Sequence, residues 1–153
     1  MEIKHYFKKD NDATIKDLEK DFIGLKYCKC VGLEARGARK NVYTENYADS
    51  DEIRVWQGKD VTREATEIVF TFYFLGDSRQ SIIDSFYEYI KNGLISYWDT
   101  KRYKKAYMIF KDKFTISEDM FVGSTPYKKV DVTFQNLWGE CKNCDDGGNV
   151  LSL

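Results

Sequence analysis

The sequence predicts one α+β domain in which β-strands predominate and a single helix follows the longest strand. Aromatic residues make up 16% of the chain, and aromatic side chains are enriched in strands and at contact surfaces. Thr66–Leu75 (TEIVFTFYFL) alternates as a strand does, and residues 82–90 have the spacing of an amphipathic helix. One proline and 10 glycines exclude a disordered or low-complexity protein.

The two ends of the chain differ in composition from the middle. Residues 1–20 are polar, and we expect them to form an N-terminal arm with at most a short, weak helix. Residues 21–138 are expected to form a single domain, which begins with a strand over residues 22–34. Residues 139–153 contain an Asp-Asp-Gly-Gly run and are expected to form a flexible C-terminal tail.

A long loop is predicted before the central strand. Residues 38–52 (ARKNVYTENYADSDE) show neither the strand nor the helix period and are rich in Asn, Asp, Ser and Tyr. Loops of this length in compact domains are usually functional. A short strand is expected at residues 53–56, directly after the loop.

The central strand and the helix after it carry the strongest pattern. Apolar residues line both faces of Thr66–Leu75, which predicts a strand covered on both sides. Asp77 is expected to cap the helix, with Gln80 three residues later in a capping-box relation. One helical face is apolar and comprises Ile82, Ile83, Phe86, Tyr89 and Ile90. Further strands are expected at residues 94–98, 106–110 and 130–137.

Charge and hydropathy exclude several classes of partner. Lys and Arg number 24 against 25 Asp and Glu, so no net charge favours a nucleic-acid or membrane-surface partner. No apolar run has the length of a signal peptide or a membrane span. We therefore expect a protein made in a cytosol, with no membrane partner and with its four cysteines reduced.

The sequence offers no catalytic constellation. His5 is the only histidine and lies in the polar N-terminal stretch, where we expect a surface residue without a role. Gly58-Lys59 lacks the preceding glycine of a phosphate loop, and no dinucleotide-binding motif follows a strand. We expect a protein that is not an enzyme and that needs no cofactor.

The cysteines leave one alternative open. Cys28, Cys30, Cys141 and Cys144 could supply four thiolates to a structural zinc, as in a small cytosolic protein-binding module. We expect instead that Cys28 and Cys30 share a buried strand face as small apolar groups, with no metal bound.

Aromatic and basic residues near loops are the candidates for contacts. Amphipathic rings at loops and strand ends are typical of protein interfaces. Basic clusters at residues 36–40 and 101–105 could meet phosphate, but such clusters are more often solvated or paired with a neighbouring subunit. The subunit-interface candidates are Tyr43, Tyr47, Trp56, Trp98 and Arg102.

The segments IVFTFYFLGDSRQSI, ISYWDTKR and VDVTFQN occur in an order that resembles the N-terminal domain of phage distal tail proteins and the related tail-tube fold. The resemblance covers about half of the chain. It implies a β-sandwich or small barrel with one α-helix packed across it, and a hexameric ring around a DNA channel. Subunits would meet through sheet edges and the long loop, here residues 40–52.

The same resemblance implies a structural virion protein of the tail, assembled in the host cytoplasm. Its partners would be further copies of itself and other tail or connector proteins, with DNA only as passing cargo. Distal tail proteins usually add a second domain, whereas we expect a single domain here. The distal ring, the tube and a terminator or connector ring therefore stay open as its position.

Overall fold

The computed structural model of the chain describes residues 3–38, 42–46, 53–57 and 63–151. Strands hold 51% of the residues and helices 13%, which confirms the α+β, mostly β class. The helices are α1 (Leu18–Asp21) and α2 (Arg79–Ile90). The strands are β1 (His5–Lys9), β2 (Ile15–Asp17), β3 (Leu25–Val31), β4 (Val42–Asn46), β5 (Ile53–Gln57), β6 (Thr66–Leu75), β7 (Leu94–Asp99), β8 (Lys104–Ile116), β9 (Met120–Val122), β10 (Thr125–Asn136) and β11 (Lys142–Asn143).

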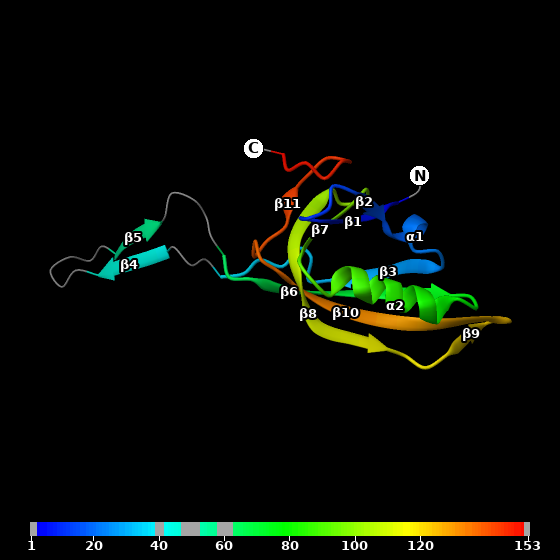
Figure 1. The fold of residues 1–153 in the computed structure, drawn as a ribbon. Coiled ribbons are helices and arrows are strands. Elements are labelled where there is room, and N and C mark those ends of the chain that lie inside the picture. Colours follow the sequence, from blue (N-terminus) through cyan, green and yellow to red (C-terminus); the bar gives the residue numbers. More distant parts are fainter. Residues whose placement is uncertain (1–2, 39–41, 47–52, 58–62, 152–153) are drawn as a thin grey trace.

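One antiparallel sheet forms the body, in the order β2-β1-β7-β8-β10-β6-β3 (Figure 1). β9 pairs antiparallel with the start of β10, and β11 pairs with β8. The sheet folds back on itself, because Tyr97 on β7 meets Phe70 on β6 edge to face, with ring centroids 4.7 Å apart. Phe7 on β1 also meets Phe70 across the core. The two halves of the sheet therefore share one aromatic core.

β6 has the predicted bounds, and its inner face is as expected. Ile68, Phe70, Phe72 and Phe74 are fully buried. On the other face Thr71 is buried, whereas Tyr73 and Leu75 keep partial exposure. The expectation of two covered faces is wrong at this end of the strand, where Tyr73 and Leu75 line an open groove.

α2 packs its apolar face over the open side of the folded sheet (Figure 1). Phe86 meets Phe72 on β6 with ring centroids 5.3 Å apart. The predicted cap is wrong: the N-cap residue is Ser78, and it makes no side-chain capping bond. Gln80 instead donates to Asp84 one turn further along the helix.

The prediction of an N-terminal arm is wrong. β1 pairs with β2 on one side and with β7 on the other, so this segment lies inside the sheet. Phe7 and Leu18 are fully buried in the common core. These two buried apolar side chains fix the segment against the core, although its other residues are mostly polar.

The prediction of a loose C-terminal tail is also wrong for residues 139–151. Lys142 and Asn143 pair with the start of β8. The indole nitrogen of Trp98 donates to the carbonyl of Asp146 at 3.0 Å, and Lys105 Nζ donates to the carbonyl of Gly148 at 2.8 Å. This segment therefore covers the outer end of β7.

The predicted long loop before β6 contains a strand. Residues 42–46 form β4, which pairs antiparallel with β5 in a separate two-stranded sheet. The sequence shows no period there because strands outside a core need no buried face.

Candidate assembly surface

The β4–β5 pair lies apart from the body at one end of the molecule (Figure 1). Tyr43 and Trp56 are direct cross-strand partners in its register. The structure therefore brings together two of the interface candidates named from sequence. Tyr47, the third, lies outside the described residues.

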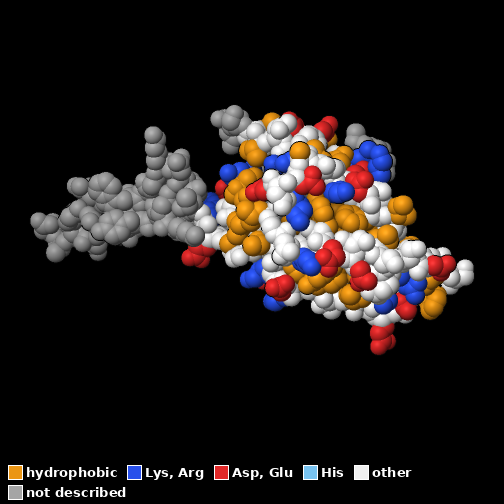
Figure 2. Space-filling model, viewed as in Figure 1, with side chains coloured by type: hydrophobic (Ala, Val, Ile, Leu, Met, Phe, Trp, Pro, Cys, Tyr) orange, Lys and Arg blue, Asp and Glu red, His pale blue; other side chains and the backbone are white. Residues whose placement is uncertain are grey.

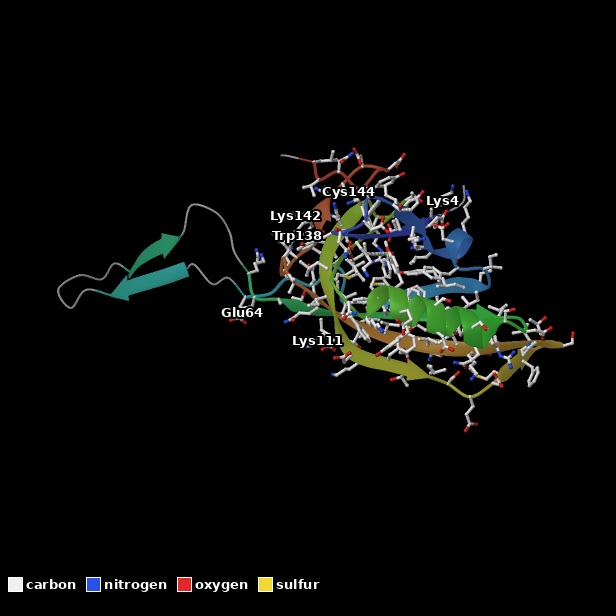
Figure 3. The ribbon with its side chains drawn as sticks, in the orientation of Figure 1. Lys4, Glu64, Lys111, Trp138, Lys142 and Cys144 are labelled. Atoms are coloured by element: carbon white, nitrogen blue, oxygen red, sulfur yellow. The ribbon has the colours of Figure 1, made fainter. Side chains whose placement is uncertain are left out.

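The base of this pair is anchored by backbone contacts. Glu64 N donates to the carbonyl of Ala38 at 2.8 Å, and Gly37 N donates to the carbonyl of Gly139 at 2.7 Å. A Cβ at Gly37 would lie 1.8 Å from the carbonyl oxygen of Glu64, so only glycine fits this close approach. Glu64 lies where the chain returns from β5 to the body (Figure 3).

Arg63 joins the three chain segments that meet at this junction. Its guanidinium donates to the carbonyl of Gly37 at 3.0 Å and lies 3.1 Å from the carboxylate of Glu140. Arg36 reaches the same carboxylate at 3.8 Å. The residues that make these contacts therefore all lie outside the β4–β5 pair.

A second surface lies at the opposite end, beside β9. An apolar groove of about 260 Å³ crosses β3, β6, β10 and β9 there. Its lining residues are Lys26, Tyr73, Leu75, Val122 and Tyr127. Tyr73 and Tyr127 meet edge to face, with ring centroids 5.5 Å apart at 86°.

Large apolar side chains surround this groove without cover. Phe121 and Val122 in β9 are 67% and 64% exposed, and Ile23 just before β3 is 78% exposed. Hydrophobic side chains are visible at the β9 end of the surface (Figure 2). Clustered exposed apolar residues mark interaction sites more often than single ones do.

Lysines lie beside Tyr73 in the groove. Lys26 on β3 and Lys129 on β10 are the register partners of Tyr73 on its two sides. The neighbouring Cys28 side chain is the main cause that raises the pKa of Tyr73. Lysines therefore flank the aromatic floor of the groove.

The edge of β3 is poorly suited to pairing with another strand. The register of β3 shifts between Tyr27 and Lys29, so that Cys28 bulges out of the ladder. Bulges and lysines are the usual means by which proteins protect exposed edges. The same bulge explains why Cys28 and Cys30 do not share a buried face as expected: Cys28 is exposed and Cys30 is half-buried.

Trp98 and Arg102, the remaining interface candidates, are used inside the subunit. Trp98 is 1% exposed beneath the C-terminal segment, so its prediction as a contact residue is wrong. Arg102 donates to the hydroxyl of Tyr27 at 3.4 Å and lies 3.9 Å from the carboxylate of Asp99.

A buried polar network surrounds that arginine, and sequence reasoning missed it. His5 is 6% exposed and its Nδ1 lies 2.9 Å from the hydroxyl of Tyr97. That hydroxyl donates to Asp99 at 3.0 Å, so it accepts the proton of His5 Nδ1. Burial lowers the pKa of His5, against the opposing effect of Asp99. The expectation of a surface histidine is therefore wrong.

The network is enclosed by packing and by backbone donors. His5 stacks on Tyr27 with ring centroids 3.7 Å apart. The amides of Lys101 and Arg102 donate to the second carboxylate oxygen of Asp99 at 3.1 and 2.7 Å. Asp99 thus closes the β7–β8 turn and, through Tyr97, orients His5. The role of this network is structural.

The four cysteines do not assemble into a metal site. In the described residues, no group of three or more His, Cys, Asp or Glu side chains is placed to hold a metal ion. Burial raises the pKa of Cys30 to about 12 and that of Cys144 to about 11, which favours the neutral thiol at both positions.

The second basic cluster also serves the fold. Lys104 Nζ donates to the side-chain carbonyl of Asn143 at 2.6 Å, and Lys105 contacts the C-terminal segment. Arg39 and Lys40 of the first cluster lie outside the described residues.

Sequence reasoning does not find the groove, because its lining residues come from four separate strands. The alternation of β6 places Tyr73 and Leu75 on its second face, but only the pairing of the four strands shows that this face is open. The one sequence signal for the groove is the apolar pair Phe121-Val122 beside Gly123, because apolar side chains next to a turn are seldom buried in the core.

No protein-family model matches the chain, and a search of curated proteins finds no match. In the part of the chain that the structure describes, no helix has the length and apolar character needed to cross a membrane.

Proposed function

We propose that this protein is a structural subunit of a phage tail, a non-catalytic member of a homo-oligomeric ring around the DNA channel. The observation that carries the proposal is the β4–β5 pair, which lies apart from the body on an anchored base. A two-stranded sheet alone is marginally stable in water, so a pair of this kind gains from packing on a partner.

The sequence resemblance to the tail-tube fold supports the phage assignment. A curled antiparallel sheet with one helix across it agrees with the fold that this resemblance implies. The His5, Tyr97 and Asp99 network also fits a structural role, because all three side chains are buried and satisfy one another. Ring closure would use repeated heterologous contacts between identical subunits.

The test removes the β4–β5 pair and leaves its base. A variant in which Gly-Asn-Gly replaces residues 39–62 keeps Ala38, Arg63 and Glu64. The proposal predicts rings of the wild-type protein in negative-stain images and folded monomers of this variant. Rings formed equally well by both proteins would overturn the role given to the pair.

A matched control keeps the length and removes the strands. Replacing residues 40–61 with a Gly/Ser segment of equal length leaves the connection intact but abolishes strand pairing. This control is expected to be monomeric as well. Rings formed by the control would mean that the body alone makes the contact.

A further inference from the structure

The two surfaces described above lie at opposite ends of one subunit. β4 and β5 occupy one end of the molecule, and β9 with the groove occupies the other (Figure 1). A heterologous contact requires two different surfaces on each copy, so that each subunit gives one and receives one. An arrangement at opposite ends satisfies this requirement.

The chemistry of the β4–β5 segment complements that of the groove. Between residues 42 and 57 the sequence holds four carboxylates, Glu45, Asp49, Asp51 and Glu52, against the single base Arg54. Lys26 lines the groove, and Lys129 is the register partner of the groove residue Tyr73 on β10. The same segment also carries aromatic and β-branched residues that an apolar groove accepts.

The other exposed parts of the sheet fit a strand partner less well. β3 is broken by its bulge at Cys28, and β2 is three residues long. A continuous added strand would find few regular hydrogen-bond partners on either edge. The groove is therefore the better receiving surface among the described residues.

We propose that the groove lined by Lys26, Tyr73, Leu75, Val122 and Tyr127 receives the β4–β5 pair of a second copy of this chain. The inference rests on the proposed ring role and specifies its contact. Apolar side chains of the incoming pair cover Val122 and the two tyrosines, and its carboxylates lie near the lysines. Each subunit gives its pair to one neighbour and receives one from the other.

The test mixes two proteins that each lack one half of the contact. The first is the excision variant, which keeps the groove. The second carries Lys26→Glu and Val122→Glu, which place negative charge at two exposed groove positions and leave the core untouched. A control carries Ile15→Glu and Lys20→Glu, the same kinds of change at exposed positions of β2 and α1.

Light scattering after size exclusion gives the outcome. Each variant alone is expected to be monomeric, with apparent self-affinity at least about tenfold below that of the wild type. Their mixture is expected to form a one-to-one dimer that grows no further, because only one complete contact is present. The control is expected to assemble as the wild type does.

Alkylation of Cys28 reports on the groove itself. Cys28 is exposed and next to Tyr73, whereas the other three thiols are half-buried or buried. The rate at which Cys28 of the excision variant is modified is expected to fall several-fold in the mixed dimer, relative to the excision variant alone.

Three results would overturn the inference, and they differ from failure of the proposed function. The groove variant could assemble as the wild type does, the mixture could stay monomeric, or Cys28 could react equally fast in the mixed dimer. In each case a loss of rings on excision would still support the ring role. A wild-type protein that never assembles contradicts the ring role and the groove contact together.

Discussion

The amide of Glu64 donates a hydrogen bond of 2.8 Å to the carbonyl of Ala38, although the whole β4–β5 pair lies between these residues in sequence. The chain therefore returns to its point of departure before it enters β6. The body holds this junction through Gly37, Gly139 and Arg63, none of which belongs to the pair. Folding of the body and display of the β4–β5 pair are separable properties.

Excision of residues 39–62 is expected to preserve stability. The entropic cost of closing a loop falls by about 0.6 kcal/mol each time the loop length is halved. The free energy of unfolding should therefore stay equal or rise by up to about 2 kcal/mol. Urea denaturation of the Gly-Asn-Gly variant and the wild type measures the difference. A loss of more than about 2 kcal/mol would mean that the β4–β5 pair is part of the folding core.

Replacement of Asp99 is expected to destabilise the fold. Its buried carboxylate accepts bonds from the Tyr97 hydroxyl and the amides of Lys101 and Arg102. Asp99→Ala leaves these donors without a partner and should cost about 3 kcal/mol by urea denaturation at pH 7. Asp99→Asn keeps the shape and should cost less. Equal stability of Asp99→Ala and the wild type would show that the network contributes nothing.

Stability is expected to depend on pH through His5. Burial lowers its pKa in the folded protein below the usual 6.5, while Asp99, Glu19 and Asp17 oppose that shift and Arg102 adds to it. The unfolded chain therefore binds more protons between the folded pKa and 6.5. The contribution of His5 is complete above pH 6.5 and declines as the pH falls, by at most about 1.4 kcal/mol per pH unit.

The variant His5→Phe isolates this effect, since phenylalanine can still stack on Tyr27. Between pH 7 and 5 its free energy of unfolding should change less than that of the wild type. Parallel curves for the two proteins would exclude His5 as the source of the pH dependence.

Gly148→Ala is expected to loosen the C-terminal segment. Gly148 has φ +79, and a Cβ there would lie 2.6 Å from the indole of Trp98. Gly123 has φ +61 with no atom within 4 Å of such a Cβ, so Gly123→Ala carries the backbone strain alone. Each should lose about 1 to 2 kcal/mol for that strain, and Gly148→Ala more because of the clash. Equal unfolding midpoints would show that the indole moves aside without cost.

Local alternation was sufficient to predict β6 and the buried face of α2. Ile68, Phe70, Phe72 and Phe74 define a strand face without knowledge of any partner. Ile83, Phe86 and Ile90 likewise define a helix face, and all three are buried. Both elements bury enough of their own apolar surface for the pattern to be visible in one segment.

β1 and the C-terminal segment could not be predicted in this way. Phe7 is one large apolar residue among polar ones, and its burial depends on Phe70 and Phe134, far along the chain. His5 is buried because β7 places Tyr97 and Asp99 beside it. Gly148 gives no signal until Trp98 lies beneath it. These features depend on pairing between distant segments.

The groove falls between these cases. Lys26, Tyr73 and Leu75 lie on strands that the sequence predicts, whereas Val122 and Tyr127 lie before the predicted start of the last strand at residue 130. The groove also depends on the register that aligns Tyr73 with Lys26 and Lys129. β4 lies in the segment predicted as a long functional loop, whereas β5 matches the short strand expected at residues 53–56. The register of the two strands cannot be read from a segment without a period.

Native mass spectrometry of the wild-type protein tests the central claim most directly. If the chain is a ring subunit that gives its β4–β5 pair to a neighbour, the spectrum should show one closed oligomer, with six copies as the resemblance implies. The excision variant should then show monomers only. Wild-type protein that appears as monomers or as simple dimers at every concentration would contradict the account.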